Sequence, residues 1–356
     1  MTRRWLGVLG ILGVAASLLV AAPADGAPTK NPYPLDNVLR VNDVQVLGTH
    51  NSYHLRPDRA MQPDDASNYA HPPLDEQLDS GIRSLEIDVQ NGPDFPVYHS
   101  IIVDQSSNCP TFAACLDTIA QWSSENPGHV PITVFVELKE LPTNGNATLQ
   151  QLIDNFVQQN HLAPWDAATL DRLDVVVRAA FAKQLITPDE VRGKHSTLRA
   201  AIMSSGWLTL GKTRGGVMVI FNSALQRPTY LAGKPSLQGR SMFVIETNAA
   251  QPSAAFVSVA MPDAARITKL LDQNMMIRTL ADADGVEARA NDLTRATNAI
   301  QSGAQVVATD YPIADPTVGP YIVKLPTTAV ARCDPVTAPR RCRDSDVENA
   351  RGLAQG

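Results

Sequence analysis

The chain has 356 residues, of which 44% are hydrophobic and 19% are charged, and its formal net charge is −6 at pH 7. This is the composition of an ordinary globular protein, long enough for one large domain or two small ones. No basic stripe interleaved with aromatic residues is present, which argues against nucleic acid as a partner.

The N-terminal segment predicts export. Arg3 and Arg4 precede an apolar run that ends near Ala22, and small residues follow up to Ala27. This pattern is typical of a secretory signal peptide, so we expect residues 1–27 to be removed and the mature protein to be secreted. Two alternatives stay open. The apolar run is borderline in length for an uncleaved membrane anchor, and the paired arginines allow a twin-arginine signal.

Eight short runs, most of them rich in valine and isoleucine and bounded by Gly, Pro or Asn, predict β-strands. In chain order they cover residues 44–48, 84–90, 96–100, 132–139, 216–222, 241–246, 274–281 and 304–312. Apolar residues at three- and four-residue spacing predict helices between some of these strands. The predicted helices cover residues 112–126, 148–162 and 292–303.

Strands that alternate with helices favour a parallel sheet. Eight of them fit the α/β class, with a TIM-type (β/α)₈ barrel in a single domain. The region 225–240 has no obvious long helix, so we expect the barrel to be irregular there. A doubly wound open sheet is the alternative, but no glycine-rich nucleotide-binding motif supports it. We place the barrel in residues 28–325 and a C-terminal extension in residues 326–356.

The four cysteines are Cys109, Cys115, Cys333 and Cys342. Four cysteines allow three pairings, and the simplest joins Cys109 to Cys115 and Cys333 to Cys342, each closing a short loop. Export to an oxidising compartment makes disulfides the expected chemistry. A zinc site is the competitor, but it lacks a C-x-x-C pair and a nearby histidine cluster. We therefore expect a disulfide loop in the C-terminal extension.

Polar side chains gather where the predicted strands end, which is the edge at which barrel enzymes build their sites. They are His50 and Asn51 after the first strand, Glu86 and Asp88 on the second, His99 at the end of the third, and Glu137 and Lys139 at the end of the fourth. Because strand side chains alternate, each pair on one strand shares a face, and three carboxylates converge if these strands are neighbours. Buried carboxylates are costly unless they are paired, so the cluster calls for a cation.

The side chains that would surround this cation offer only oxygen atoms, which suits calcium. They are Asn51, Glu86, Asp88 and Glu137. Zinc would be expected to recruit His50 or His99 directly, and magnesium stays open. The alternative is a salt-bridged set in which Lys139 neutralises part of the charge.

The two histidines on different strand ends predict acid–base work, because imidazole titrates near neutrality. A phosphodiester suits the arrangement: one histidine deprotonates an attacking hydroxyl and the other protonates the departing alkoxide. Each histidine alone is more often a hydrogen-bonded structural residue. The prediction therefore depends on the combination of both histidines with the carboxylates.

These residues stand in stretches that resemble a known family. "LGTHNSYH", "SLEIDVQ", "VYHS" and "ITVFVELK" are similar to the catalytic strands of the calcium-dependent, bacterial-type phosphoinositide-specific phospholipases C. The resemblance continues through "GAQVVATDYP" to "ARCDPVTAP" and so covers roughly residues 40–342. It implies a TIM-type barrel that cleaves the glycerol–phosphate bond of phosphatidylinositol. The products would be diacylglycerol and an inositol phosphate, through a cyclic phosphodiester made by the inositol 2-hydroxyl.

By this resemblance His50 and His99 match the two catalytic histidines, and the four oxygen-bearing side chains match the calcium ligands. His99 would activate the hydroxyl, and His50 would stabilise the pentavalent phosphate and help proton transfer. Lys139 could contact a phosphate oxygen or form an ion pair with a neighbouring glutamate. Arg278, on the seventh predicted strand, could bind the inositol ring or phosphate through its planar donor fork. Asp310, at the last strand end, could orient a basic residue.

Two other functions stay open at this point. A related barrel phosphodiesterase, of the glycerophosphodiesterase or sphingomyelinase-D type, also places acidic metal ligands and two histidines at strand ends. A secreted binding protein on the same scaffold is a non-enzymatic alternative. The expected partner is a phosphoinositide lipid at a membrane surface, and no protein partner is evident from the sequence.

Overall fold

The computed structural model describes residues 1–2, 32–58 and 65–348. Contacts divide the chain into two units, Met1–Asn31 and Pro32–Gly356, and the fold below is that of the second. The predicted signal peptide lies outside the described residues, apart from its first two. No helix in the part of the chain that the structure describes is long and apolar enough to cross a membrane.

Eight parallel strands form a nearly closed barrel, as the sequence predicts. They are β1 Val44–Thr49, β2 Ser84–Gln90, β3 Ile132–Lys139, β4 Val217–Asn222, β5 Phe243–Val244, β6 Phe256–Ser258, β7 Met276–Leu280 and β8 Val306–Thr309. The strand order is β5-β4-β3-β2-β1-β8-β7-β6. An isolated parallel bridge between Ile245 and Phe256 joins the two ends of this order. The barrel is least regular there, because β5 and β6 have only two and three residues.

The predicted strand at 96–100 is wrong. Val97 and Pro96 make only isolated antiparallel bridges, to Val89 and Thr111, in the loop that follows β2. The missing barrel strand is instead β6, a three-residue segment flanked by small residues that show no clear alternation. A short apolar run bounded by Pro and Ser therefore resembled a barrel strand, while the true strand was too short to be seen in the sequence.

The three predicted helices are confirmed as α2 Phe112–Glu125, α3 Ala147–Gln159 and α11 Thr294–Gln301. The first two begin at capping side chains, Thr111 and Asn146, which accept hydrogen bonds from backbone N–H groups of the first turn. The remaining helices were not predicted from the sequence. They are α1 Leu74–Asp79, α4 Ala167–Phe181, α5 Pro188–Arg192, α6 Leu198–Ser204, α7 Leu210–Thr213, α8 Arg227–Leu231, α9 Ala264–Leu271 and α10 Val286–Ala290.

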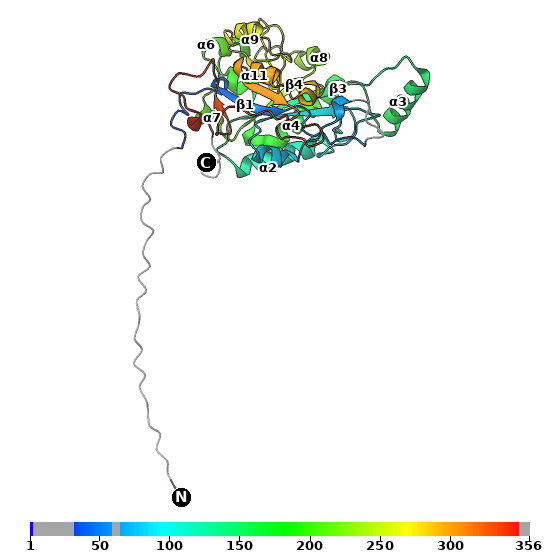
Figure 1. Cartoon of the computed structure of the whole chain (residues 1–356), viewed down its shortest axis with the longest axis horizontal. Coiled ribbons are helices and arrows are strands. Elements are labelled where there is room, and N and C mark those ends of the chain that lie inside the picture. Colours follow the sequence, from blue (N-terminus) through cyan, green and yellow to red (C-terminus); the bar gives the residue numbers. More distant parts are fainter. Residues whose placement is uncertain (3–31, 59–64, 349–356) are drawn as a thin grey trace. The chain divides into compact units, whose positions relative to one another are not determined.

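Helices cover the outside of the strands, and α2 and α4 lie side by side (Figure 1). The region 225–240 contains only the five-residue α8, which confirms that no long helix forms there. Barrel register places Asp88 of β2 opposite Glu137 of β3. The face of β3 that carries Glu137 also carries Phe135. The guanidinium carbon of Arg278 on β7 lies 5.1 Å from the centroid of the Phe135 ring. Residues of this face therefore meet across the barrel interior.

The C-terminal residues pack against the amino ends of the strands. Strand β9, Arg332–Cys333, pairs antiparallel with β1. Glu348 is fully buried, where it accepts hydrogen bonds from the Arg83 guanidinium and from the Val130 backbone N–H. This contact ties the chain beyond the barrel to the residues just before β2 and β3. The boundary between barrel and extension at residue 325 stays a prediction.

Both predicted disulfides are present. Cys109 is joined to Cys115, and Cys333 is joined to Cys342. The first closes the loop after β2 onto the first turn of α2. The second closes a loop that begins at β9. Neither pair leaves a cysteine for a zinc site, because no free cysteine remains in the described chain.

Candidate active site

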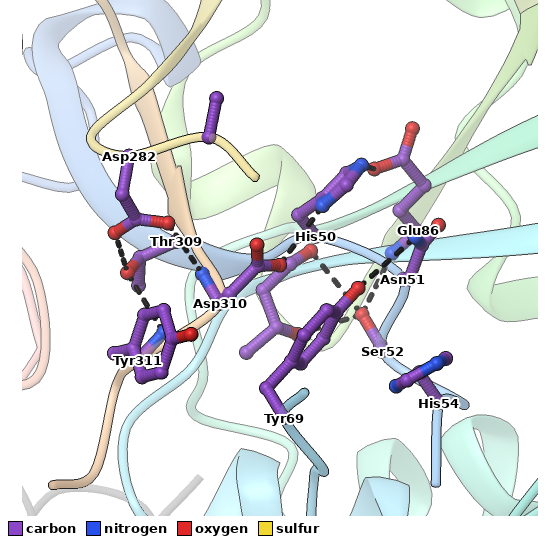
Figure 2. A network of polar contacts seen from close by, with 12 residues as sticks. His50, Asn51, Ser52, His54, Tyr69, Glu86, Asp282, Thr309, Asp310 and Tyr311 are labelled. Atoms are coloured by element: carbon purple, nitrogen blue, oxygen red, sulfur yellow. Dashed lines mark hydrogen bonds and ion pairs between the residues drawn. The ribbon is translucent and has the colours of Figure 1, made fainter. Parts of the chain in front are cut away.

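His50 follows β1 directly and lies between two carboxylates (Figure 2). Its Nδ1 is 2.9 Å from Oδ1 of Asp310, and its Nε2 is 3.9 Å from Oε2 of Glu86. Burial lowers the pKa of His50, but the carboxylates of Asp310 and Glu86 outweigh it and raise that pKa to about 9. The side chain is still 36% exposed. His50 is therefore an imidazolium at neutral pH that a carboxylate orients and solvent can reach, and the predicted orienting role of Asp310 is seen here.

Asp310 is itself held by a second aspartate. Its backbone N–H donates to Oδ1 of Asp282 at 2.9 Å. The hydroxyls of Thr309 and Tyr321 donate to the other oxygen of Asp282. Burial and the nearby charge of Asp310 raise the pKa of Asp282 to about 7. This network fixes the end of β8, and with it the carboxylate that orients His50.

The loop after β1 is tied to β2 by reciprocal hydrogen bonds. The Ser52 backbone N–H donates to the Glu86 carbonyl at 2.9 Å, and the Glu86 N–H donates to Ser52 Oγ at 2.8 Å. Asn51 has a φ of 45°, a left-handed conformation that asparagine tolerates better than most residues. Its Nδ2 donates to the Tyr69 hydroxyl at 3.1 Å (Figure 2). The amide is thereby oriented, and its oxygen stays available to a cation.

The three predicted calcium-binding carboxylates each contact a basic side chain. Lys139 Nζ is 2.8 Å from Oδ2 of Asp88 and 3.0 Å from Oε1 of Glu137. Arg278 donates to Oε2 of Glu86. Burial raises the pKa of Asp88 despite the opposing effect of the lysine. For Glu137 burial also raises the pKa, but Lys139 outweighs it and the net pKa is lowered.

The two carboxylate partners of Lys139 raise its pKa. Burial lowers the pKa of its ammonium, but the carboxylates of Asp88 and Glu137 outweigh burial and raise it. The lysine is therefore a permanent cation at this position. Of the two roles predicted for Lys139, the ion pair is the one in the structure, although Asp88 takes part in it as well as a glutamate.

The residues fit a hard cation by their chemistry. Asp88 is fully buried, and its Oδ1 accepts no hydrogen bond from the described residues. Together with Glu86, Glu137 and the Asn51 amide, it provides the all-oxygen set that calcium prefers. Among the residues that the structure describes, however, no three histidine, cysteine or carboxylate side chains stand close enough to enclose a metal. The carboxylates are held by Arg278 and Lys139 instead.

His99 lies in the loop after β2, not at a strand end as expected. Its Nδ1 is 3.3 Å from Oδ2 of Asp104, and the same oxygen is 2.9 Å from Nε2 of His54. Burial raises the pKa of Asp104, but hydrogen bonds from the two histidines outweigh it and lower that pKa to about 2. Asp104 is therefore ionised, and it orients an exposed histidine on one side and a buried one on the other.

Aromatic contacts connect the surroundings of the two histidines. His54 stacks on Tyr69 at a centroid distance of 4.4 Å, and Tyr69 accepts the hydrogen bond from Asn51. His71 Nε2 donates to the His50 carbonyl at 2.9 Å, and burial lowers the pKa of His71 to about 4. His54 and His71 thus form a buried scaffold. Asp104 and Tyr69 were not predicted, because nothing in their local pattern distinguishes them from loop residues. Asp282 was also not predicted, although it directly follows the predicted strand at 274–281, a position typical of site residues.

A hollow of about 310 Å³ opens beside His99. His99 shares its walls with Glu137 and Lys139, and Ile101, Leu138 and Pro142 add apolar surface. The structure therefore brings one predicted catalytic histidine, one predicted metal ligand and one predicted substrate-binding residue to the same opening. His50, Glu86 and Arg278 meet in the adjoining network.

A match to a known protein family identifies the class of enzyme to which this site belongs. The sequence model of the family described as "Phosphoinositide phospholipase C, Ca2+-dependent" matches residues 39–95 and 90–335. The chain belongs to this family. It is accordingly a phosphoric diester hydrolase, and calcium is its cofactor. The family match removes the related barrel phosphodiesterases and the binding protein as alternatives.

Solved structures of phospholipases C from bacteria share the fold. A Ca²⁺-dependent phosphatidylinositol-specific phospholipase C from Streptomyces antibioticus has 16% identity and a TM-score of 0.54, over 79% of this chain and 97% of that one. A calcium-dependent phosphoinositol-specific phospholipase C from a Gram-negative Pseudomonas sp. has 16% identity and a TM-score of 0.53, over 79% and 94%. A search of curated proteins finds no match.

Proposed function

We propose that this phospholipase C is exported and cleaves phosphatidylinositol at a membrane surface with His99 and His50 as its acid–base pair. Asn51, Glu86, Asp88 and Glu137 would hold the calcium ion, and Lys139 and Arg278 would contact the substrate. The observation that carries the proposal is that His50 and His99 are each bonded through Nδ1 to a different buried aspartate.

The hydrogen bonds define the proton that each histidine can move. Because Nδ1 of His99 donates to Asp104, its Nε2 is left with a lone pair that can accept the proton of the inositol 2-hydroxyl. The hydroxyl oxygen then bonds to phosphorus, and the bond from phosphorus to the glycerol oxygen breaks. The products are diacylglycerol and a cyclic inositol phosphate.

His50 serves the other side of the reaction. As an imidazolium whose Nδ1 is bonded to Asp310, it has one N–H left, on Nε2. This group can donate a hydrogen bond to a phosphate oxygen and pass its proton to the departing glycerol oxygen. When bound, calcium supplies positive charge that lowers the pKa of the attacking hydroxyl and stabilises the charge on phosphorus.

Export is supported by two independent features. The first 27 residues have the pattern of a signal peptide. The two disulfides are stable chiefly in oxidising compartments. A phosphoinositide substrate then requires the mature protein to act on lipid outside the compartment in which it was made.

The test is diacylglycerol release from phosphatidylinositol vesicles by the purified mature chain, with calcium and with excess chelator. We expect release that requires calcium. His50→Ala and His99→Ala should each lower the rate by at least about 10²-fold without changing the melting temperature by more than a few degrees. Release that survives the chelator would remove the calcium ligand set, and a histidine variant with a near-normal rate would remove that histidine from the mechanism.

A further inference from the structure

Lys139 occupies a particular place among the proposed calcium ligands. It is the last residue of β3, two positions after Glu137 on the same face, and Asp88 stands opposite Glu137 in the register. Its ammonium therefore bridges two strands, at 2.8 Å from Asp88 and 3.0 Å from Glu137. The oxygens that it holds belong to two of the four side chains proposed to bind calcium.

The Lys139 ammonium and a calcium ion cannot both bind the carboxylate oxygens of Asp88 and Glu137 closely. Carboxylate oxygens that bind calcium lie 2.3–2.6 Å from the ion. The double positive charge of the ion would repel an ammonium group in the same cluster. In the described residues the carboxylates are not gathered into a metal cage but are bonded to basic side chains. Closing the ligand set around calcium therefore requires the lysine to move.

The two basic residues of the cluster differ in their freedom. The Arg278 guanidinium is buried and lies over the ring of Phe135, so its position is fixed by packing. Lys139 stands at the end of its strand, its side chain is 19% exposed, and it lines the hollow beside His99. A lysine side chain carries its ammonium group on a flexible four-carbon chain. The group can therefore leave one partner for another without motion of the backbone.

We infer that Lys139 is an internal competitor of calcium, which holds Asp88 and Glu137 until the metal binds and then turns into the hollow beside His99. There its charge would meet the substrate phosphate, so one residue would both weaken calcium binding and serve the substrate. This inference rests on the proposed calcium ligand set. It assigns Lys139 a role in setting the calcium concentration at which the enzyme works.

The primary test is calorimetric titration of the calcium-stripped mature chain with calcium chloride alone. Lys139→Met should bind calcium at least about tenfold more tightly than the wild type, because a positive charge within bonding distance of the ligands is gone. Lys139→Arg keeps the charge and should show no such gain. Lys212→Met, at an exposed position on α7 away from the carboxylates, is the matched control and should leave the affinity unchanged.

Thermal melting adds an independent readout. In chelator, Lys139→Met should melt at a lower temperature than the wild type, because Asp88 loses the partner that offsets its burial. In saturating calcium this difference should shrink. Calcium affinity in Lys139→Met that equals or falls below that of the wild type would overturn the inference, and so would an unchanged melting temperature in chelator.

A measurement on the wild type avoids any dependence on the variant's folding. Acylation of surface amines followed by peptide mass spectrometry reports how accessible Lys139 is. Its labelling should rise when calcium is added, and equal or lower labelling would contradict the release of the lysine. If the wild type shows no calcium binding at all, the proposed ligand set fails first. If wild type and Lys139→Met bind calcium equally well, the ligand set stands and the role of Lys139 falls.

Discussion

At the scale of single residues, two buried carboxylates orient the histidines proposed to be catalytic. Asp310 and Asp104 each accept a hydrogen bond from Nδ1 of one histidine. Each contact fixes the orientation of its ring, and in the proposed mechanism it leaves Nε2 of the ring for the reaction. Asp104 does more than this, because the same oxygen also binds the buried His54. It is therefore a positioning residue for the loop as well as for His99.

Asp104→Asn tests this role. The amide oxygen carries no charge, so it should hold the two histidines more weakly than the carboxylate does, and the orientation of His99 should be less well fixed. We expect kcat to fall by about 10²-fold while KM changes little, since no substrate contact is removed. Steady-state kinetics on phosphatidylinositol vesicles would measure both constants.

Asp334→Asn is the matched control for that experiment. Asp334 is equally buried, at 2% exposure against 1% for Asp104, but lies just after β9, far along the chain from the histidines. It should affect the melting temperature and leave kcat unchanged. If Asp104→Asn keeps a near-normal kcat, Asp104 has no part in positioning His99.

At the scale of elements, the loop after β2 is the part of the barrel that differs from its sequence-based prediction. The segment that carries His99 has strand-like composition, yet it forms only isolated bridges and folds back as a loop. Two features hold that loop: the Asn108 backbone N–H donates to the Tyr53 carbonyl at 2.8 Å, and Cys109 is joined to Cys115. The position of His99 is therefore set by a cross-linked loop and not by a strand end.

The two disulfides provide a matched comparison. Serine in place of both Cys109 and Cys115, or of both Cys333 and Cys342, should each cost about 2 kcal/mol of stability, since both loops are short. Only the first pair should also lower kcat, because it anchors the end of the loop that carries His99 and Asp104, whereas the second lies at the amino ends of the strands. Denaturant unfolding and diacylglycerol release measure the two effects. An equal loss of kcat in both variants would contradict this assignment.

At the scale of the whole molecule, buried histidines link folding to pH. His129 is fully buried between α2 and the segment that precedes β3. Its Nδ1 donates to the Val130 carbonyl at 2.6 Å, and its Nε2 accepts from the Ser123 hydroxyl at 2.7 Å. A second proton would place a positive charge at this buried position. Burial accordingly lowers the pKa of His129 from its usual 6.5 to about 4.

A histidine with a lowered folded pKa stabilises the protein above its unfolded pKa, and that stability is lost as the pH falls from 6.5 through about 4. Between pH 7 and pH 4 the loss should be about 3 kcal/mol for this group. The free energy of unfolding of the wild type and of His129→Gln can be measured in urea at several pH values. The difference between the two proteins gives the contribution of His129 apart from that of the carboxylates that titrate in the same pH range. A free-energy difference between the two proteins that does not change with pH would contradict the prediction.

The sequence by itself determined the features that depend on neighbouring positions. Strand alternation placed Glu86 with Asp88 and Glu137 with Lys139, and the small separations of the cysteines indicated their pairing. The ordered motifs predicted the family and the barrel. These are local properties, because the period of a strand and the length of a loop can be read along the chain.

Only the tertiary structure decided which side chains meet across the barrel. His50 and Asp310 are 260 positions apart, and Arg278 and Glu86 are 192 apart, so their contacts exist only once the first and last strands have paired. The pairing of β2 with β3 gave Lys139 its second partner, Asp88, and the folding of the loop after β2 brought Asp104 against His99. Partner choice over such separations depends on how the strands register and how the loops pack, and no local pattern in the sequence records that choice.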